Sequence, residues 1–129
     1  MNIPFKLGVI TDEVSQNIFE AAAFCKKYGL DCMEVRSVND RSPFDFTDCD
    51  ITDINAAAKQ YGLKVCAVSS PLFKCDFNDE AAIISHIANF EKCAQRANQI
   101  GAEMIRGFDF WDCGVSLKNR AEKYKRIVE

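Results

Sequence analysis

A short pattern recurs three times along this chain: a stretch with helical spacing, then a glycine, then a short apolar run. The glycines are Gly29, Gly62 and Gly101, which lie 33 and then 39 residues apart. A repeat of this length is typical of a supersecondary unit that is used several times in one fold. Each glycine suits the position just past a helix end, where a positive φ penalises any side chain with a Cβ atom.

Apolar residues spaced three and four apart predict four amphipathic helices. We expect the first helix to be capped near Ser15 and the second to be capped by Asp50, because short polar side chains accept hydrogen bonds from the free amides at a helix start. The four stripes are Ile18, Ala22, Cys25 and Tyr28; Ile51, Ile54, Ala58 and Tyr61; Ile83, Ile87, Phe90, Ala94 and Ala97; and Leu117, Ala121, Tyr124 and Val128.

A short run with strand character precedes each of these helices. The predicted strands are residues 6–10, 32–36, 64–69 and 103–107, so the order is βαβαβαβα. This alternation predicts a parallel sheet with right-handed helical crossovers. No linker rich in Pro, Gly or Ser interrupts the pattern, and we expect residues 1–129 to form one unit.

Two architectures fit four βα units: a small open doubly wound sheet with helices on both faces, or half of an eight-stranded barrel with helices outside only. Glu34 and Arg36 share one face of the second predicted strand, and Arg106 lies on the fourth. Charges are costly beneath a packed helix but reasonable in a barrel lumen, so they favour the (βα)4 half-barrel. Placement of these charges at strand ends in solvent is the alternative.

Seven large aromatic residues fall in the predicted strand-to-helix loops, at the end of a βα barrel where substrates bind. They would either wall a pocket or pack the seam between helices and sheet, and the sequence leaves both open. The residues are Phe44, Phe46, Phe73, Phe77, Phe108, Phe110 and Trp111.

Composition narrows the class of protein. A net charge of −3 and a pI near 5.2 disfavour a nucleic-acid partner. No apolar run approaches the roughly 18 residues of a membrane span, and no signal segment opens the chain. The seven cysteines include no C-x-x-C pair, which predicts free thiols in a cytoplasmic protein. Cys75 and Cys113 lie in predicted loops and are the alternative candidates for a reactive thiol.

Length adds a further expectation. A complete eight-stranded barrel needs about 250 residues, whereas this chain has 129. The sequence also ends within the stripe of the fourth predicted helix. We interpret the chain as half of a barrel that is interrupted in the middle of the fold.

Four segments, in order, resemble the sugar phosphate isomerase/epimerase family, the xylose isomerase-like barrels. They are Gly8–Gln16 (GVITDEVSQ), Tyr28–Arg36 (YGLDCMEVR), Ser69–Cys75 (SSPLFKC) and Ile100–Phe108 (IGAEMIRGF). Each motif is weakly specific by itself, but their order and spacing match the first four strands of that family. The resemblance spans essentially the whole chain and only the N-terminal half of the family's barrel.

The resemblance implies an aldose–ketose isomerase or an epimerase that moves a proton between adjacent carbons of a sugar-like substrate. It also implies a divalent metal held by the second half of the barrel, so we expect no metal ligand or cofactor in this chain. The single histidine, His86, falls on a predicted helix, where we expect a surface or packing role. By the family analogy, Glu34 is the candidate catalytic residue, as a substrate-orienting or secondary acid.

Arg36 and Arg106 are candidates for binding hydroxyl, carboxylate or phosphate groups through forked hydrogen bonds. Pairing with Glu34 in a structural network is the alternative for both. The other candidate substrate-binding residues are Ser69, Lys74, Phe108 and Trp111.

Three functions compete. The first is part of an isomerase or epimerase that is inactive by itself. The second is a non-catalytic sugar- or phosphate-binding half-barrel that self-associates into a homo-oligomer through its exposed strand edges. The third, an open flavodoxin-like regulator, is disfavoured because no glycine-rich phosphate loop follows the first strand.

Overall fold

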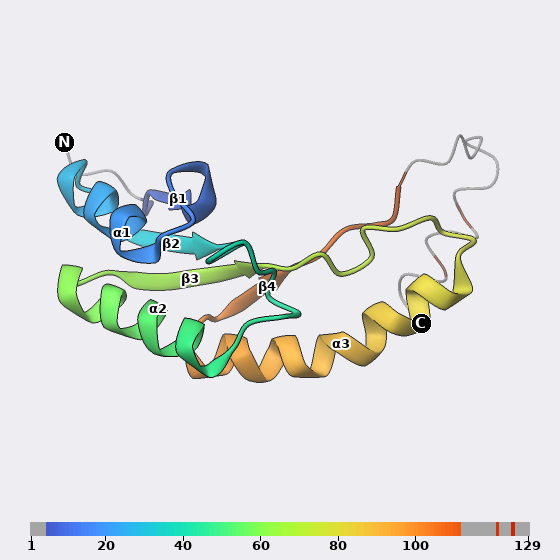
Figure 1. Ribbon diagram of the computed structural model, residues 1–129. Coiled ribbons are helices and arrows are strands. Elements are labelled where there is room, and N and C mark those ends of the chain that lie inside the picture. Colours follow the sequence, from blue (N-terminus) through green and yellow to red (C-terminus); the bar gives the residue numbers. More distant parts are fainter. Residues whose placement is uncertain (1–4, 112–120, 122–124, 126–129) are drawn as a thin grey trace.

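The computed structural model describes residues 5–111 together with Ala121 and Lys125 (Figure 1). The fourth predicted helix and Cys113 lie, apart from those two single residues, outside the described part. In order, the elements are β1 (Gly8–Ile10), a short 3₁₀ helix (Thr11–Glu13), α1 (Ile18–Lys27), β2 (Cys32–Val35), α2 (Asp48–Tyr61), β3 (Lys64–Ser69), α3 (Glu80–Gln99) and β4 (Met104–Arg106).

The four strands form one parallel sheet in the order β1-β2-β3-β4. Each crossover therefore steps to the next position in the same direction. Right-handed crossovers that all step one way place their helices on the same face of the sheet, whereas a doubly wound sheet reverses direction and covers both faces. The half-barrel prediction is confirmed, and the open doubly wound alternative is wrong.

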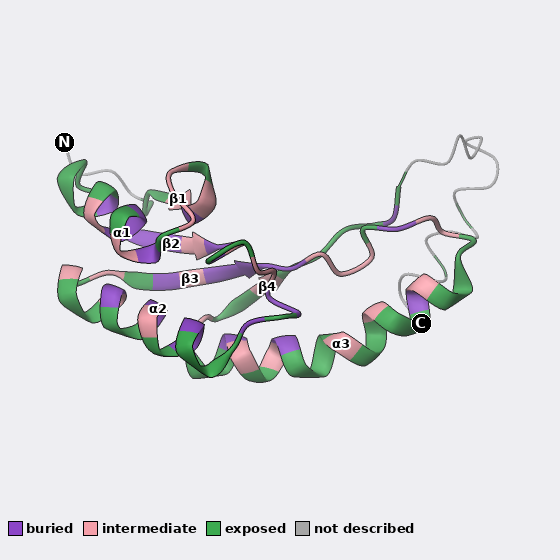
Figure 2. Ribbon diagram, in the orientation of Figure 1, coloured by how far each residue is buried: buried purple, intermediate pink, exposed green. Residues whose placement is uncertain are grey.

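One hydrophobic core fills the space between the sheet and the helices (Figure 2). Met33 and Val35 of β2 are fully buried in it, while Glu34 lies on the opposite face, as the predicted alternation requires. Val65 and Val68 of β3 also face the core although they are three residues apart. The register shift between Met33 and Glu34 in the β2–β3 pairing accounts for this spacing. The helices contribute Ile18, Ala22, Cys25, Ile51, Ile54, Ala57, Cys93 and Ala97.

The apolar stripe of α3 is buried over only part of its length. Cys93 and Ala97 lie in the main core, whereas Ile87 is 57% exposed and Phe90 is 37% exposed. Figure 1 shows why: the N-terminal half of α3 extends past the ends of the strands. None of the described helices is long and apolar enough to cross a membrane.

The glycine prediction is confirmed: Gly29, Gly62 and Gly101 have φ of +67°, +65° and +69°. No atom lies within 4 Å of an added Cβ at any of them, so backbone conformation and not space requires glycine there. The cap of α1 lies near Ser15, as predicted: Asn17 accepts from the amide of Phe19 at 3.0 Å. The prediction that Asp50 caps α2 is wrong by three residues.

The cap of α2 is Thr47, and Asp50 sits at the third helical position and closes a capping box with it. Asp50 is fully buried, and its carboxylate also accepts two 2.7 Å hydrogen bonds from Arg41 and one of 3.0 Å from Asn39. The hydrogen bonds from Arg41 lower the pKa of Asp50 well below its usual range, and those from Thr47 and Asn39 add to this against the effect of burial. Asp50 thus anchors the loop between β2 and α2 to the helix.

Replacing this carboxylate with an amide, Asp50→Asn, is expected to lower the free energy of unfolding by about 2 kcal/mol. The value lies below that of a fully buried ion pair because the exposed side of Arg41 lets water screen part of the charge. Since folding lowers the pKa of Asp50, its stabilisation is present above the ordinary carboxyl pKa of about 3.9 and is lost as the pH falls. Urea unfolding measured between pH 3 and pH 7 tests both points.

The matched control is Asp53→Asn, one turn further along α2, where the carboxylate forms no ion pair with any described residue. We expect this variant to unfold within about 0.5 kcal/mol of the parent protein. Equal losses in the two variants would contradict the anchoring role of Asp50.

Candidate functional site

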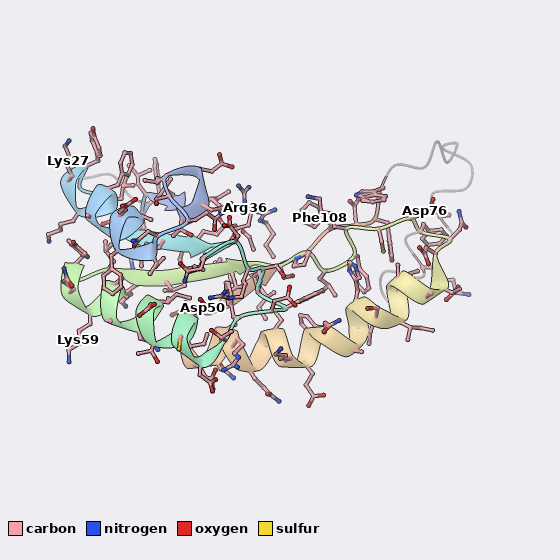
Figure 3. All side chains as sticks on the ribbon, viewed as in Figure 1. Lys27, Arg36, Asp50, Lys59, Asp76 and Phe108 are labelled. Carbon is pink, nitrogen blue, oxygen red and sulfur yellow. The ribbon has the colours of Figure 1, made fainter. Side chains whose placement is uncertain are left out.

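A cavity of about 250 Å³ lies at the carboxyl-terminal ends of the strands. In Figure 3, Arg36 and Phe108 lie at this end of the sheet, while Asp50 lies in the first turn of α2. The lining residues come from the segments that follow all four strands: Asp12 after β1; Arg36, Ser37, Asp40, Ser42 and Pro43 after β2; Ser69, Ser70, Pro71 and Lys74 at and after β3; and Arg106 and Phe108 at and after β4.

Three neighbouring strands contribute one side chain each to a hydrogen-bonded group beside this cavity. Arg106 Nε donates to Glu34 Oε1 at 2.9 Å, and Arg106 Nη2 donates to Ser69 Oγ at 2.8 Å. Ser69 Oγ in turn donates to Glu34 Oε1. The sheet register creates this arrangement, because Ser69 pairs with Arg106 and Glu34 pairs with Ala67, so all three side chains lie on the face away from the helices.

The group determines the charge state of Glu34. Burial raises the pKa of Glu34, but hydrogen bonds from Ser69 and Arg106 and the positive charges of Arg106 and Arg36 outweigh burial, so its pKa lies below the ordinary value. Glu34 is therefore ionised at neutral pH. A carboxylate held in this way is a weak base and a firm hydrogen-bond acceptor.

Arg36 belongs to a second charged group. Its Nε atom lies 3.0 and 2.9 Å from the two carboxylate oxygens of Asp12, and its Nη2 atom lies 2.7 Å from Oε1 of Glu13. Of the two arginines, only Arg106 is therefore paired with Glu34. Arg36 instead links the end of β2 to the 3₁₀ helix that follows β1.

Lys74 is the third cation of the cavity. Its Nζ atom lies 5.6 Å from the centre of the Phe108 ring, and Arg106 Cζ lies at the same distance from that ring. Both cations thus contact the aromatic face that closes one side of the cavity. Within the described part of the chain, Lys74 forms no ion pair, in contrast to Arg36 and Arg106.

The structure brings most of the predicted site residues together. Five of the six substrate-binding candidates line the cavity, and Glu34 lies directly behind two of them. Trp111 does not line it: this side chain is 55% exposed. Its backbone amide donates to the carbonyl of Cys75 at 2.9 Å. The five lining candidates are Arg36, Ser69, Lys74, Arg106 and Phe108.

The aromatic residues of the strand-to-helix loops do not form a wall of the cavity. Phe44 and Phe46 are buried in the main core, which is the packing alternative. Phe73, Phe77 and Phe110 form a second apolar cluster with Cys75 and Ile83. Of the seven loop aromatics, only Phe108 lines the cavity.

Several lining residues were not predicted. Asp40, Ser42 and Pro43 belong to the loop between β2 and α2, and Ser70 and Pro71 follow β3. The first of these segments is the longest stretch without helix or strand periodicity in the sequence, which is the signal that could have indicated a functional loop.

Metal ligands and reactive thiols are the two other kinds of site to consider among the described residues. Among the described residues, no group of three or more His, Cys, Asp or Glu side chains is placed to hold a metal ion. The thiols of Cys25, Cys32, Cys49, Cys66 and Cys93 are free. Burial raises the pKa of Cys93 to about 11, and Cys75 is also buried, so these two behave as core residues.

Comparison with known proteins gives a matching family and solved structures of similar fold. The model of the xylose isomerase-like TIM barrel family matches residues 22–129. A structure of similar fold is the apo form of 3-keto-D-glucoside 4-epimerase from E. coli, with a TM-score of 0.54 and 21% sequence identity. The match covers 69% of this chain and 32% of the epimerase, so the chain spans about a third of that protein. No curated protein matches the sequence.

Removing one hydroxyl tests the electrostatics of this site. Ser69→Ala is expected to raise the pKa of Glu34 toward its ordinary value, because the carboxylate loses a hydrogen bond that favours its charged form. Carboxyl ¹³C NMR across an acid titration measures the effect. Ser37→Ala is the control, since Ser37 lines the same cavity but donates to Gln16. An unchanged Glu34 pKa in Ser69→Ala would show that Glu34, Ser69 and Arg106 do not form this hydrogen-bonded group, the three-strand group.

Proposed function

Since this chain belongs to the xylose isomerase-like TIM barrel family, we propose that it forms the N-terminal, substrate-contacting part of a sugar isomerase or epimerase. The reaction would move a proton between adjacent carbons of a sugar or a sugar phosphate. One observation supports this assignment most: side chains from three neighbouring strands meet at the carboxyl-terminal edge of the sheet, which is where βα barrels bind substrates.

The cavity offers the groups that a sugar requires. A sugar presents neighbouring hydroxyl and carbonyl oxygens above an apolar face of C–H bonds. Arg106 supplies hydrogen-bond donors, Glu34, beside the cavity, supplies an acceptor, and Phe108 supplies a flat apolar surface. The single O–H of Ser69 is donated to Glu34, so Ser69 Oγ offers a sugar only a lone pair. A few fixed polar groups beside an aromatic ring are typical of small-molecule pockets.

Each residue has a distinct role in the proposal. Removing a proton next to a carbonyl places negative charge on the carbonyl oxygen, and Arg106 together with Lys74 would stabilise that charge. Glu34 would orient Arg106 and one substrate hydroxyl and would leave proton abstraction to another group, since its lowered pKa makes it a weak base. We propose that residues outside the described part supply this base and hold the divalent metal of the complete barrel.

Lys74 supports a second candidate, a half-barrel that binds a sugar phosphate without catalysis. Within the described part of the chain it is the cavity cation that has no carboxylate partner, so it could receive a phosphate. Strands β1 and β4 each pair on one side only, and such edges would allow a second copy to associate.

Binding of D-fructose and of D-fructose 6-phosphate tests the proposal on this chain. We expect both sugars to shift the amide NMR signals of residues 69–74 and 106–108. Arg106→Gln should weaken the binding of both sugars about tenfold, because it removes charge-assisted hydrogen bonds. Lys74→Gln should weaken only the phosphorylated sugar if the phosphate lies beside Lys74.

Arg96→Gln is the matched control, since Arg96 pairs with Asp48 between α2 and α3 and lies away from the cavity. We expect it to bind both sugars like the parent chain. Equal affinity in Arg106→Gln and Arg96→Gln, or no saturable binding of either sugar, would refute the proposed site.

A further inference from the structure

The segment after β3 and the segment after β4 run beside each other beyond the end of the sheet (Figure 1). Backbone hydrogen bonds join them: the amide of Phe108 donates to the carbonyl of Leu72 at 2.8 Å, and the amide of Trp111 donates to that of Cys75 at 2.9 Å. These two segments carry Lys74 and Phe108, so the cavity depends on their position. Leu72 packs against the main core, and beyond it the two segments are held by the second apolar cluster.

Two residues of this cluster have backbone conformations that L-residues rarely adopt. Phe73 has φ of +58° and Phe110 has φ of +69°, and their rings stack with centres 4.9 Å apart. Each such conformation costs about 1–2 kcal/mol. The loop therefore keeps its shape only while contacts from neighbouring elements outweigh this cost.

His86 of α3 supplies such a contact. Its Nδ1 atom accepts a hydrogen bond from the backbone amide of Phe73 at 2.8 Å. Its ring meets the ring of Phe44 edge-on, with centres 5.7 Å apart. Phe44 belongs to the β2–α2 loop, two residues from Ser42 in the cavity wall. His86 thus contacts two loops that both contribute residues to the cavity wall.

We propose that His86 is a positioning residue: its neutral ring holds the β3–α3 loop, and with it Lys74, in the cavity wall, and protonation of the ring releases that loop. The cavity's role as a substrate site rests on the proposed function, whereas the loop's dependence on His86 does not.

Hydrogen-bond chemistry gives the direction of the effect. A neutral imidazole has one nitrogen that accepts, and here Nδ1 accepts from Phe73. An imidazolium carries a proton on both nitrogens, so Nδ1–H would face the Phe73 amide, donor against donor. Protonation of the ring therefore removes the acceptor and loosens the loop.

The ionisable groups around His86 lie on the two packed loops and not at the neighbouring positions of its own helix. On that helix, the positions three and four residues away are Ala82, Ile83, Asn89 and Phe90, none of which is ionisable. The ionisable residues of the two packed loops are Arg36, Asp40, Arg41 and Asp45 on one side and Lys74, Cys75, Asp76 and Asp79 on the other.

Amide hydrogen exchange without any ligand tests the proposal. In His86→Leu we expect the peptide covering residues 70–79 to exchange about tenfold faster or more, while peptides of β2 and α2 keep their rates. His86→Asn should restore protection to within about threefold, because its Oδ1 atom can take the place of Nδ1 as acceptor. Equal exchange of residues 70–79 in the parent chain and His86→Leu would overturn the proposal, as would failure of His86→Asn to restore protection.

Fluorescence gives a second readout, because the chain has a single histidine and a single tryptophan, Trp111, on the paired segment. We expect acidification to change the emission of Trp111 in the parent chain and to leave it constant in His86→Asn. The same pH dependence in both proteins would overturn the proposal. A parent chain that binds no sugar but shows these loop effects would refute the proposed function and leave the role of His86 intact.

Discussion

The order of the four parallel strands is the constraint on which the rest of this structure depends. Because every crossover moves to the next position in the same direction, all helices cover one face and all carboxyl-terminal strand ends meet at one edge. Glu34, Ser69 and Arg106 are up to 72 residues apart in sequence, yet they share one hydrogen-bonded group because of that order. A different strand order would keep the same helices and strands and would separate these side chains.

The segments that line the cavity are held by fewer contacts the farther they lie from the sheet. The three-strand group stands on paired strands beside the main core, and the β2–α2 loop is anchored through the buried carboxylate of Asp50. The β3–α3 loop is held by the smaller apolar cluster and by the hydrogen bond to His86. Two phenylalanines of that cluster have left-handed backbone conformations. Hydroxyl and carboxylate groups that need fixed directions thus lie on the strands, while the cation Lys74 and the aromatic face of Phe108 lie on segments beyond the ends of the strands.

Much of the fold and the strand-borne part of the site could be predicted from the sequence, because both follow from local periodicity. Alternation along β2 separated Glu34 from Met33 and Val35, and spacing after the repeated glycines located each strand. The caps of α1 and α2 and the pairing of Arg36 depend on side-chain geometry that no period encodes. The loop aromatics illustrate the same limit, since Phe44 and Phe108 look alike in sequence, but one is buried in the core and the other lines the cavity. His86 was expected to pack or lie at the surface, and its hydrogen bond to Phe73 depends on a loop conformation that follows no sequence rule.

The strand order itself can be measured most directly by interstrand nuclear Overhauser effects in isotope-labelled protein. We expect contacts between backbone protons of β1 and β2, of β2 and β3, and of β3 and β4, including the neighbourhood of the Ser69–Arg106 pair. A doubly wound sheet would instead place β1 between β2 and β3 or between β2 and β4. Contacts of β1 with β3 or with β4 would contradict the half-barrel and the site assembled on its edge.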